Sequence, residues 1–150
     1  TAFQVFFPAV EGRSPAVAPE GSSMRLGSGE HILVVDDEPS LVRIANRLLE
    51  RLGYRVTAHT QSTEALADFL ARPDDFDLVL SDLTMPQMTG LDLASRLLER
   101  RPELPILLTS GYAGALDPAE LRRVGVRELV GKPFLTATLA DAVARALHRG

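Results

Sequence analysis

Acidic residues, a hydroxyl and one lysine stand at the ends of four short apolar runs in this 150-residue sequence. They are Asp36 and Asp37, then Asp82, Ser110 and Lys132. Carboxylate oxygens without neighbouring His or Cys favour magnesium over zinc. A carboxylate beside magnesium and a lysine is equipped to attack phosphorus, and a nearby hydroxyl can hydrogen-bond to a phosphoryl oxygen. If the fold brings these residues together, they predict a site for phosphoryl chemistry.

The hydrophobic pattern after residue 30 alternates between the two secondary-structure types. Continuous apolar runs predict buried strands over 32–35, 76–81 and 105–109. Short strands are predicted over 54–58 and 127–130. Apolar residues at helical spacing predict helices over 39–52, 63–71, 91–101, 118–124 and 136–148. Five such units predict an α/β fold, a doubly wound parallel sheet with helices on both faces. Ligands bind at the carboxyl ends of the strands in such sheets, which is where the polar residues stand.

The composition indicates a soluble globular domain and excludes several classes of function. Hydrophobic residues make up 45% and charged residues 24%, a balance unlike that of disordered chains. The net charge of −4 argues against nucleic acid as a partner. The absence of cysteine excludes disulfides, thiolate zinc sites and thiol catalysis. No apolar run approaches the ~18–20 residues of a membrane span, so we expect a cytoplasmic protein whose segment here makes no membrane contact.

The first 30 residues differ from the rest of the chain. Residues 1–8 alternate like a strand and end at Pro8, which indicates either the remnant of a preceding domain or a tail. Residues 9–30 are rich in Gly, Pro and Ser and predict a flexible linker. The domain therefore covers 31–150.

Four motifs in order resemble the receiver domain of two-component response regulators. They are VVDDEP at 34–39, SDLTMPQMTG at 81–90, PILLTSG at 105–111 and GKPF at 131–134. Each motif alone is common, but all four stand at successive strand ends over residues 31–148. The resemblance implies a flavodoxin-like receiver fold with strand order 2-1-3-4-5.

The resemblance also implies a chemical role for each acidic residue. Asp82 would accept a phosphoryl group from a phosphohistidine in a Mg²⁺-dependent reaction that switches the conformation. Asp36, Asp37, Asp82 and the backbone carbonyl of Thr84 would bind the Mg²⁺, for which Mn²⁺ could substitute.

Further roles implied by the resemblance fall on strands four and five. Ser110 would be the switch hydroxyl that moves to the phosphoryl oxygen, and Lys132 would bind the same group. The Lys132–Pro133 bond would be cis. Leu129 occupies the position usually held by a switching Tyr or Phe, so we expect the aromatic signal to be absent or altered.

The opening residues TAFQVFFPA resemble the closing strand of the ATP-binding domain of histidine kinases. This order of segments predicts the C-terminal receiver of a hybrid sensor histidine kinase, a transferase. The chain itself is expected not to be an enzyme, because it carries no phosphorylatable-histidine motif and no glycine-rich ATP lid. Its partners would be a histidine kinase core, its own or separate, and a histidine phosphotransfer domain.

Two other functions stay open at the level of sequence. A haloacid-dehalogenase-type phosphatase also combines an Asp nucleophile, a lysine and magnesium, although Asp36-Asp37-Glu38 fits that motif poorly and no cap insertion is present. A degenerate receiver used only for protein contact is the other alternative. Intact Asp37, Asp82 and Lys132 argue against it, whereas Leu129 keeps it open.

Overall fold

A single five-stranded parallel sheet organises the computed structural model, which describes residues 27–111, 117–132 and 136–148. The order of the strands is β2-β1-β3-β4-β5, as expected for a doubly wound fold. The strands are β1 (His31–Val35), β2 (Arg55–His59), β3 (Leu78–Asp82), β4 (Ile106–Ser110) and β5 (Glu128–Gly131). The predicted fold class and strand order are confirmed.

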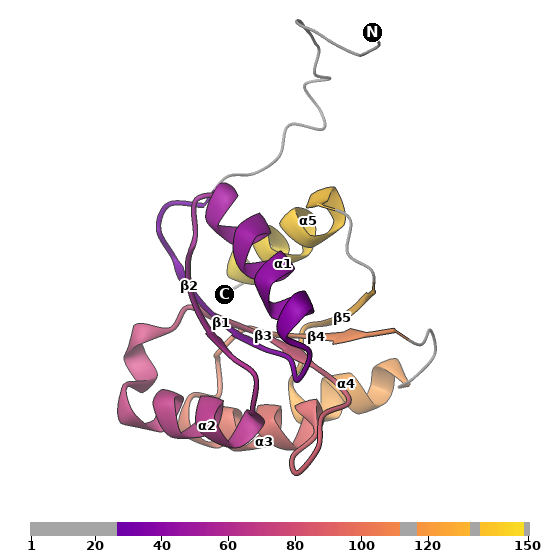
Figure 1. The fold of residues 1–150 in the computed structure, drawn as a ribbon. Coiled ribbons are helices and arrows are strands. Elements are labelled where there is room, and N and C mark those ends of the chain that lie inside the picture. The colour runs from indigo at the N-terminus through magenta and orange to yellow at the C-terminus, as the bar shows by residue number, and fades with distance from the viewer. Residues whose placement is uncertain (1–26, 112–116, 133–135, 149–150) are drawn as a thin grey trace, which may run out of the picture.

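Helices cover both faces of this sheet (Figure 1). Figure 1 shows α1 and α5 on one face and α2, α3 and α4 on the other. The helices are α1 (Pro39–Arg51), α2 (Ser62–Ala71), α3 (Gly90–Arg100), α4 (Pro118–Val124) and α5 (Thr136–His148), with a short 3-10 helix η3 (Pro73–Asp75) after α2. Within the described ranges, none of these helices has the length and apolarity that crossing a membrane requires.

Two apolar clusters hold the helices to the sheet, one on each face. Every residue of β1, β3 and β4 is buried, as expected for central strands covered on both sides. Alternate residues of β1 enter different clusters: Leu33 and Val35 pack with residues of α2 and α3, whereas Ile32 and Val34 pack with residues of α1 and α5. The two clusters fix the strands, and the strands in turn fix the positions of their carboxyl ends.

The third strand begins later than predicted and ends one residue further on. The expected strand 76–81 becomes Leu78–Asp82. Phe76 instead stacks on Phe69 with ring centroids 6.0 Å apart, and it is fully buried. The extension at the other end makes Asp82 the last residue of a central strand.

The described part of the predicted linker 9–30 contacts the turn between α1 and β2. The Gly29 N–H donates to the Gly53 carbonyl at 3.0 Å. Gly53 has φ +98°, the left-handed conformation that glycine adopts most easily after a helix. The predicted strand at 1–8 lies outside the described residues.

Candidate functional site

The register of the sheet places the predicted site residues along one edge. Asp82 pairs with Thr109, and Ser110 pairs with Gly131, the residue before Lys132. Because all neighbouring strands are parallel, their carboxyl ends meet at the same edge of the sheet. The ladder therefore brings the ends of β3, β4 and β5 together.

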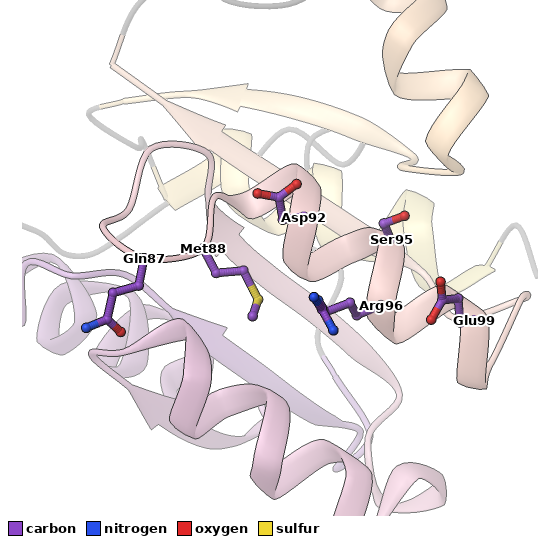
Figure 2. Close-up of a pocket in the computed structure, with 6 residues that line it drawn as sticks. All are labelled: Gln87, Met88, Asp92, Ser95, Arg96 and Glu99. Atoms are coloured by element: carbon purple, nitrogen blue, oxygen red, sulfur yellow. The ribbon is translucent and has the colours of Figure 1, made fainter.

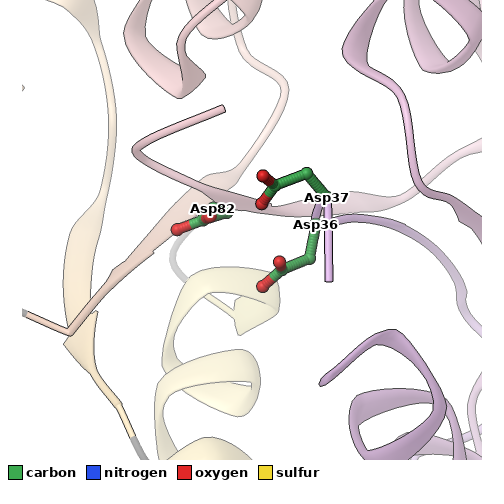
Figure 3. A group of neighbouring side chains, drawn as sticks. All are labelled: Asp36, Asp37 and Asp82. Atoms are coloured by element: carbon green, nitrogen blue, oxygen red, sulfur yellow. The ribbon is translucent and has the colours of Figure 1, made fainter. Parts of the chain in front are cut away.

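Three carboxyl groups share a small volume at this edge. One carboxylate oxygen from each of Asp36, Asp37 and Asp82 lies within 4.8 Å of the other two. Figure 3 shows the carboxyl groups of Asp36 and Asp37 directed toward Asp82. Asp36 and Asp82 are buried, whereas Asp37 is exposed. Like charges this close repel unless cations offset them, and hard oxygen donors suit Mg²⁺, so the donor set fits the predicted ion.

Lys132 supplies a cation that contacts two of these three carboxyl groups. Its Nζ donates to Asp36 Oδ2 at 3.0 Å and lies 3.1 Å from Asp82 Oδ1, and its side chain is only 15% exposed. Burial acts to lower the pKa of Lys132, but the hydrogen bonds to Asp36 and Asp82 outweigh it and raise the pKa above its ordinary value. The ammonium therefore stays charged at neutral pH and ties two strand ends together.

Burial makes the charge on Asp82 unfavourable. Burial raises the pKa of the Asp82 carboxyl group. The hydrogen bond from Lys132 lowers this pKa, whereas the nearby charge of Asp36 raises it further. A backbone hydrogen bond from Thr84 further favours the ionised form. Asp82 is thus a buried carboxyl group whose ionised form is stabilised by Lys132 and by the Thr84 backbone, which suits a nucleophile that acts beside a metal ion.

Asp36 is held by hydrogen bonds on both of its carboxylate oxygens. Oδ1 accepts from the Glu38 N–H at 2.9 Å, and Oδ2 accepts from Lys132. Its own backbone N–H donates to the His59 carbonyl at 3.2 Å, which extends the ladder past the end of β1. The two neighbouring acidic residues therefore differ: Asp36 is fixed and Asp37 is open to solvent.

Gly90 lets α3 begin directly against the acceptor strand. A Cβ at this position would lie 2.3 Å from the Asp82 carbonyl oxygen and 2.9 Å from the Leu83 Cα. The Gly90 N–H donates to the Leu83 carbonyl at 2.8 Å, and the Thr89 side chain caps α3 by accepting from Asp92 N–H. The close approach of backbone to backbone explains why this position carries no side chain.

Two further predicted site residues, Ser110 and Leu129, lie on β4 and β5. Ser110 is buried at the end of β4, and its carbonyl accepts from the Lys132 N–H at 2.8 Å. Leu129 lies on β5 opposite Leu108 and packs against the core cluster on the α3 side. Pro133 lies outside the described residues, so the cis bond stays a prediction, as does the metal-binding role of the Thr84 carbonyl.

A pocket that the sequence did not predict adjoins the acidic cluster. It has a volume of about 190 Å³ and is lined by Asp37, by the turn Thr60–Ser62 before α2 and by the loop Met85–Gln87. We call it the Asp37 pocket. Ser62 is buried here, and no pattern indicated its burial, since a serine at a helix start usually faces solvent.

A larger groove of about 480 Å³ runs along α3 and shares no residue with the carboxylate cluster (Figure 2). It is lined by Gln87, Met88, Asp92, Ser95, Arg96 and Glu99. Figure 2 shows Asp92, Ser95, Arg96 and Glu99 along the helix and Gln87 and Met88 on the loop before it. These residues contribute nothing to the five-residue set that the sequence singled out.

Known proteins match this chain over most of the described domain. Residues 32–144 match the family model of the response regulator receiver domain. The chemotaxis protein CheY of Pseudomonas aeruginosa is 36% identical over 121 residues, which cover 79% of this chain and 96% of CheY. The transcriptional regulatory protein DctD of Rhizobium meliloti is 30% identical over 81% of this chain, but the match spans only 26% of DctD.

A solved structure agrees with the same assignment. The response regulator TrrA of Thermotoga maritima, solved in complex with Mg²⁺–BeF, superposes with a TM-score of 0.71 and 29% identity over 79% of this chain and 99% of TrrA. The family match favours the receiver over the phosphatase alternative, because it covers the acidic cluster and Lys132 together. The chain therefore belongs to the response regulator receiver domain family of two-component signalling.

Proposed function

We propose that Asp82 accepts a phosphoryl group from a phosphohistidine of a partner protein in a Mg²⁺-dependent reaction. The observation that carries this proposal is the position of the Asp82 carboxylate, buried between Lys132 Nζ at 3.1 Å and the carboxyl groups of Asp36 and Asp37. A carboxylate in this setting can be ionised by cations and directed at phosphorus. TrrA, whose structure superposes on this chain, was solved in complex with Mg²⁺–BeF, which supports a divalent ion as a ligand of this domain.

The residues divide the reaction between them. A carboxylate oxygen of Asp82 attacks the phosphorus; an O–P bond forms, and the N–P bond to the donor imidazole breaks with its electron pair staying on nitrogen. Asp36, Asp37, Asp82 and the Thr84 carbonyl would hold Mg²⁺, which offsets the charge of the transferring group. Lys132 binds a phosphoryl oxygen through Nζ. Ser110 donates a hydrogen bond to another.

Phosphorylation replaces contacts that hold the unphosphorylated site. Lys132 bonds to Asp36 and Asp82 in this structure, so a phosphoryl group on Asp82 competes for the same ammonium. Movement of Ser110 and Lys132 toward the phosphoryl oxygens then shifts the population of conformations near β4 and β5. Leu129 repacks without the reorientation of an aromatic ring.

We further propose that the receiver is the C-terminal part of a cytoplasmic hybrid histidine kinase, with residues 1–8 as the end of its ATP-binding domain and 9–30 as the linker. The resemblance of TAFQVFFPA to the closing kinase strand supports this origin. The donor is then the kinase core or a histidine phosphotransfer domain. Transfer of labelled phosphate from such a phosphorylated domain to this chain tests the partner assignment.

Acetyl phosphate and intact-mass measurement test the central proposal. With Mg²⁺, the wild-type chain should gain one phosphoryl group, and chelation of Mg²⁺ should prevent the gain. Asp82→Asn should gain none while keeping the circular dichroism spectrum of the fold. Asp92→Asn, which changes an exposed carboxylate on α3, is the matched control and should behave like wild type. Modification of Asp82→Asn to the wild-type extent would refute the assignment.

A further inference from the structure

The Asp37 pocket contains a buried hydroxyl that none of the roles above uses. Ser62 is 2% exposed, and its Oγ has no hydrogen-bond partner. In the part of the chain that the structure describes, only Asn46 Oδ1 shares this condition. A buried hydroxyl without a partner is costly, so native structures usually pair it with protein, water or a ligand. The position of Ser62 in the wall of the pocket points to a group bound there.

The chemistry of the walls limits what that group can be. Asp37 places a negative charge in the pocket, which disfavours an anion. Thr60, Gln61 and Gln87 add hydroxyl and amide groups, and Met85 and Pro86 form the apolar wall. A volume of about 190 Å³ is well above the roughly 10–15 Å³ that a bound water molecule needs. The pocket thus suits the hydrated side of a cation.

Asp37 belongs both to this pocket and to the carboxylate cluster. Mg²⁺ keeps several waters even when carboxylates bind it, and each metal-bound water donates hydrogen bonds. A serine oxygen can accept such a bond through its lone pairs. Lys132 contacts Asp36 and Asp82, which are buried, whereas Asp37 is the exposed member of the cluster and leaves room for metal-bound water on its side.

We propose that Ser62 is an outer-sphere residue of the divalent-cation site, accepting a hydrogen bond from a water bound to the ion held by Asp36, Asp37 and Asp82. This inference rests on the proposed function. It assigns Ser62 a positioning role rather than a catalytic one, since the residue acts on the ion through water. Outer-shell partners of this kind tune metal affinity.

Isothermal titration of the full chain with Mg²⁺, without phosphodonor, tests the inference. Ser62→Ala should raise the Kd about tenfold. The metal-free Tm of this variant should stay equal or rise, because the substitution removes an unpaired buried hydroxyl. Ser62→Thr keeps the hydroxyl and should hold the Kd within about threefold of wild type. Ser95→Ala removes an exposed hydroxyl on α3 and should change neither quantity.

The outcomes separate this inference from the proposed function. A Kd of Ser62→Ala equal to that of wild type overturns the inference, and so does a tenfold loss in both Ser62→Ala and Ser62→Thr, which would indicate packing. A lower metal-free Tm in Ser62→Ala overturns it as well. If the wild-type chain binds no Mg²⁺ and takes no phosphoryl group, the proposed function itself fails. If it does both while Ser62→Ala binds Mg²⁺ equally well, only the role of Ser62 fails.

Discussion

Replacing Lys132 with methionine tests the electrostatic account of the site. The substitution keeps an apolar stem of similar length but removes the charge that lies 3.0 Å from Asp36 and 3.1 Å from Asp82. At an effective dielectric constant of about 20, each of these pairs attracts by about 5 kcal/mol before the cost of desolvating the ammonium. Without the lysine, two carboxylates within 4.8 Å remain, and their repulsion is about 3.5 kcal/mol.

We therefore expect Lys132→Met to lower the free energy of unfolding of the metal-free domain by about 3–5 kcal/mol, the range found when one partner of a buried ion pair is removed. For a domain of this size the loss corresponds to a Tm lower by about 10–15 °C. Thermal denaturation in EDTA measures it. Saturating Mg²⁺ should restore more stability to the variant than to wild type, because the ion neutralises the same carboxylates.

Arg145→Met is the matched control. The Arg145–Glu128 ion pair, at 2.8 Å, is as short as those of Lys132, but the two side chains are 48% and 36% exposed. Solvent screening limits such a pair to about 1 kcal/mol. A Tm for Lys132→Met in EDTA equal to or above that of wild type would refute the view that Lys132 offsets an otherwise repulsive carboxylate cluster.

Two further predictions concern the surroundings of the site. Gly90→Ala should lower the free energy of unfolding, measured in urea, by about 2 kcal/mol or more, because its Cβ would collide with the Asp82 backbone. Gly111→Ala should be nearly neutral, because its Cβ would meet no atom of the described residues within 4 Å. An equal effect of the two would contradict the clash. Asp68 has a pKa lowered from 3.8 to about 2, first by its hydrogen bond from Arg72, so its carboxylate stabilises the fold above pH 3.8 and the gain is lost as pH falls toward 2. Asp68→Asn should therefore cost about 1 kcal/mol at neutral pH and progressively less below pH 4 in urea titrations, and a pH-independent difference would argue against this account.

Sequence reasoning located the acceptor site because its residues stand at strand ends. Asp36, Asp82 and Ser110 each follow or end a buried apolar run, and parallel strands bring such positions to one edge. The periodicity of apolar residues therefore predicted both the sheet and the convergence of the polar residues. Lys132 was predicted to bind a phosphoryl oxygen. In this structure it also offsets the charges of Asp36 and Asp82, which the sequence did not indicate.

Features that depend on loop packing could not be predicted in this way. Ser62 has the sequence context of an ordinary residue at a helix start, yet it is buried and lines the same pocket as the loop Met85–Gln87. Phe76 reads as part of a strand, but it turns into the core against Phe69. Neither feature leaves a periodic signal in the sequence, since each involves segments that only the tertiary fold brings together.

Main-chain pairing aligns the reacting groups: Asp82 pairs with Thr109, and Ser110 pairs with Gly131. This has a consequence for how the sequence of such a domain can change. The spacing between the reacting groups is inherited from main-chain hydrogen bonds, which any sequence of similar shape reproduces. The outward faces of the helices bear none of that geometric demand. Substitutions of exposed helix residues can thus create new binding surfaces while the reacting groups keep their positions.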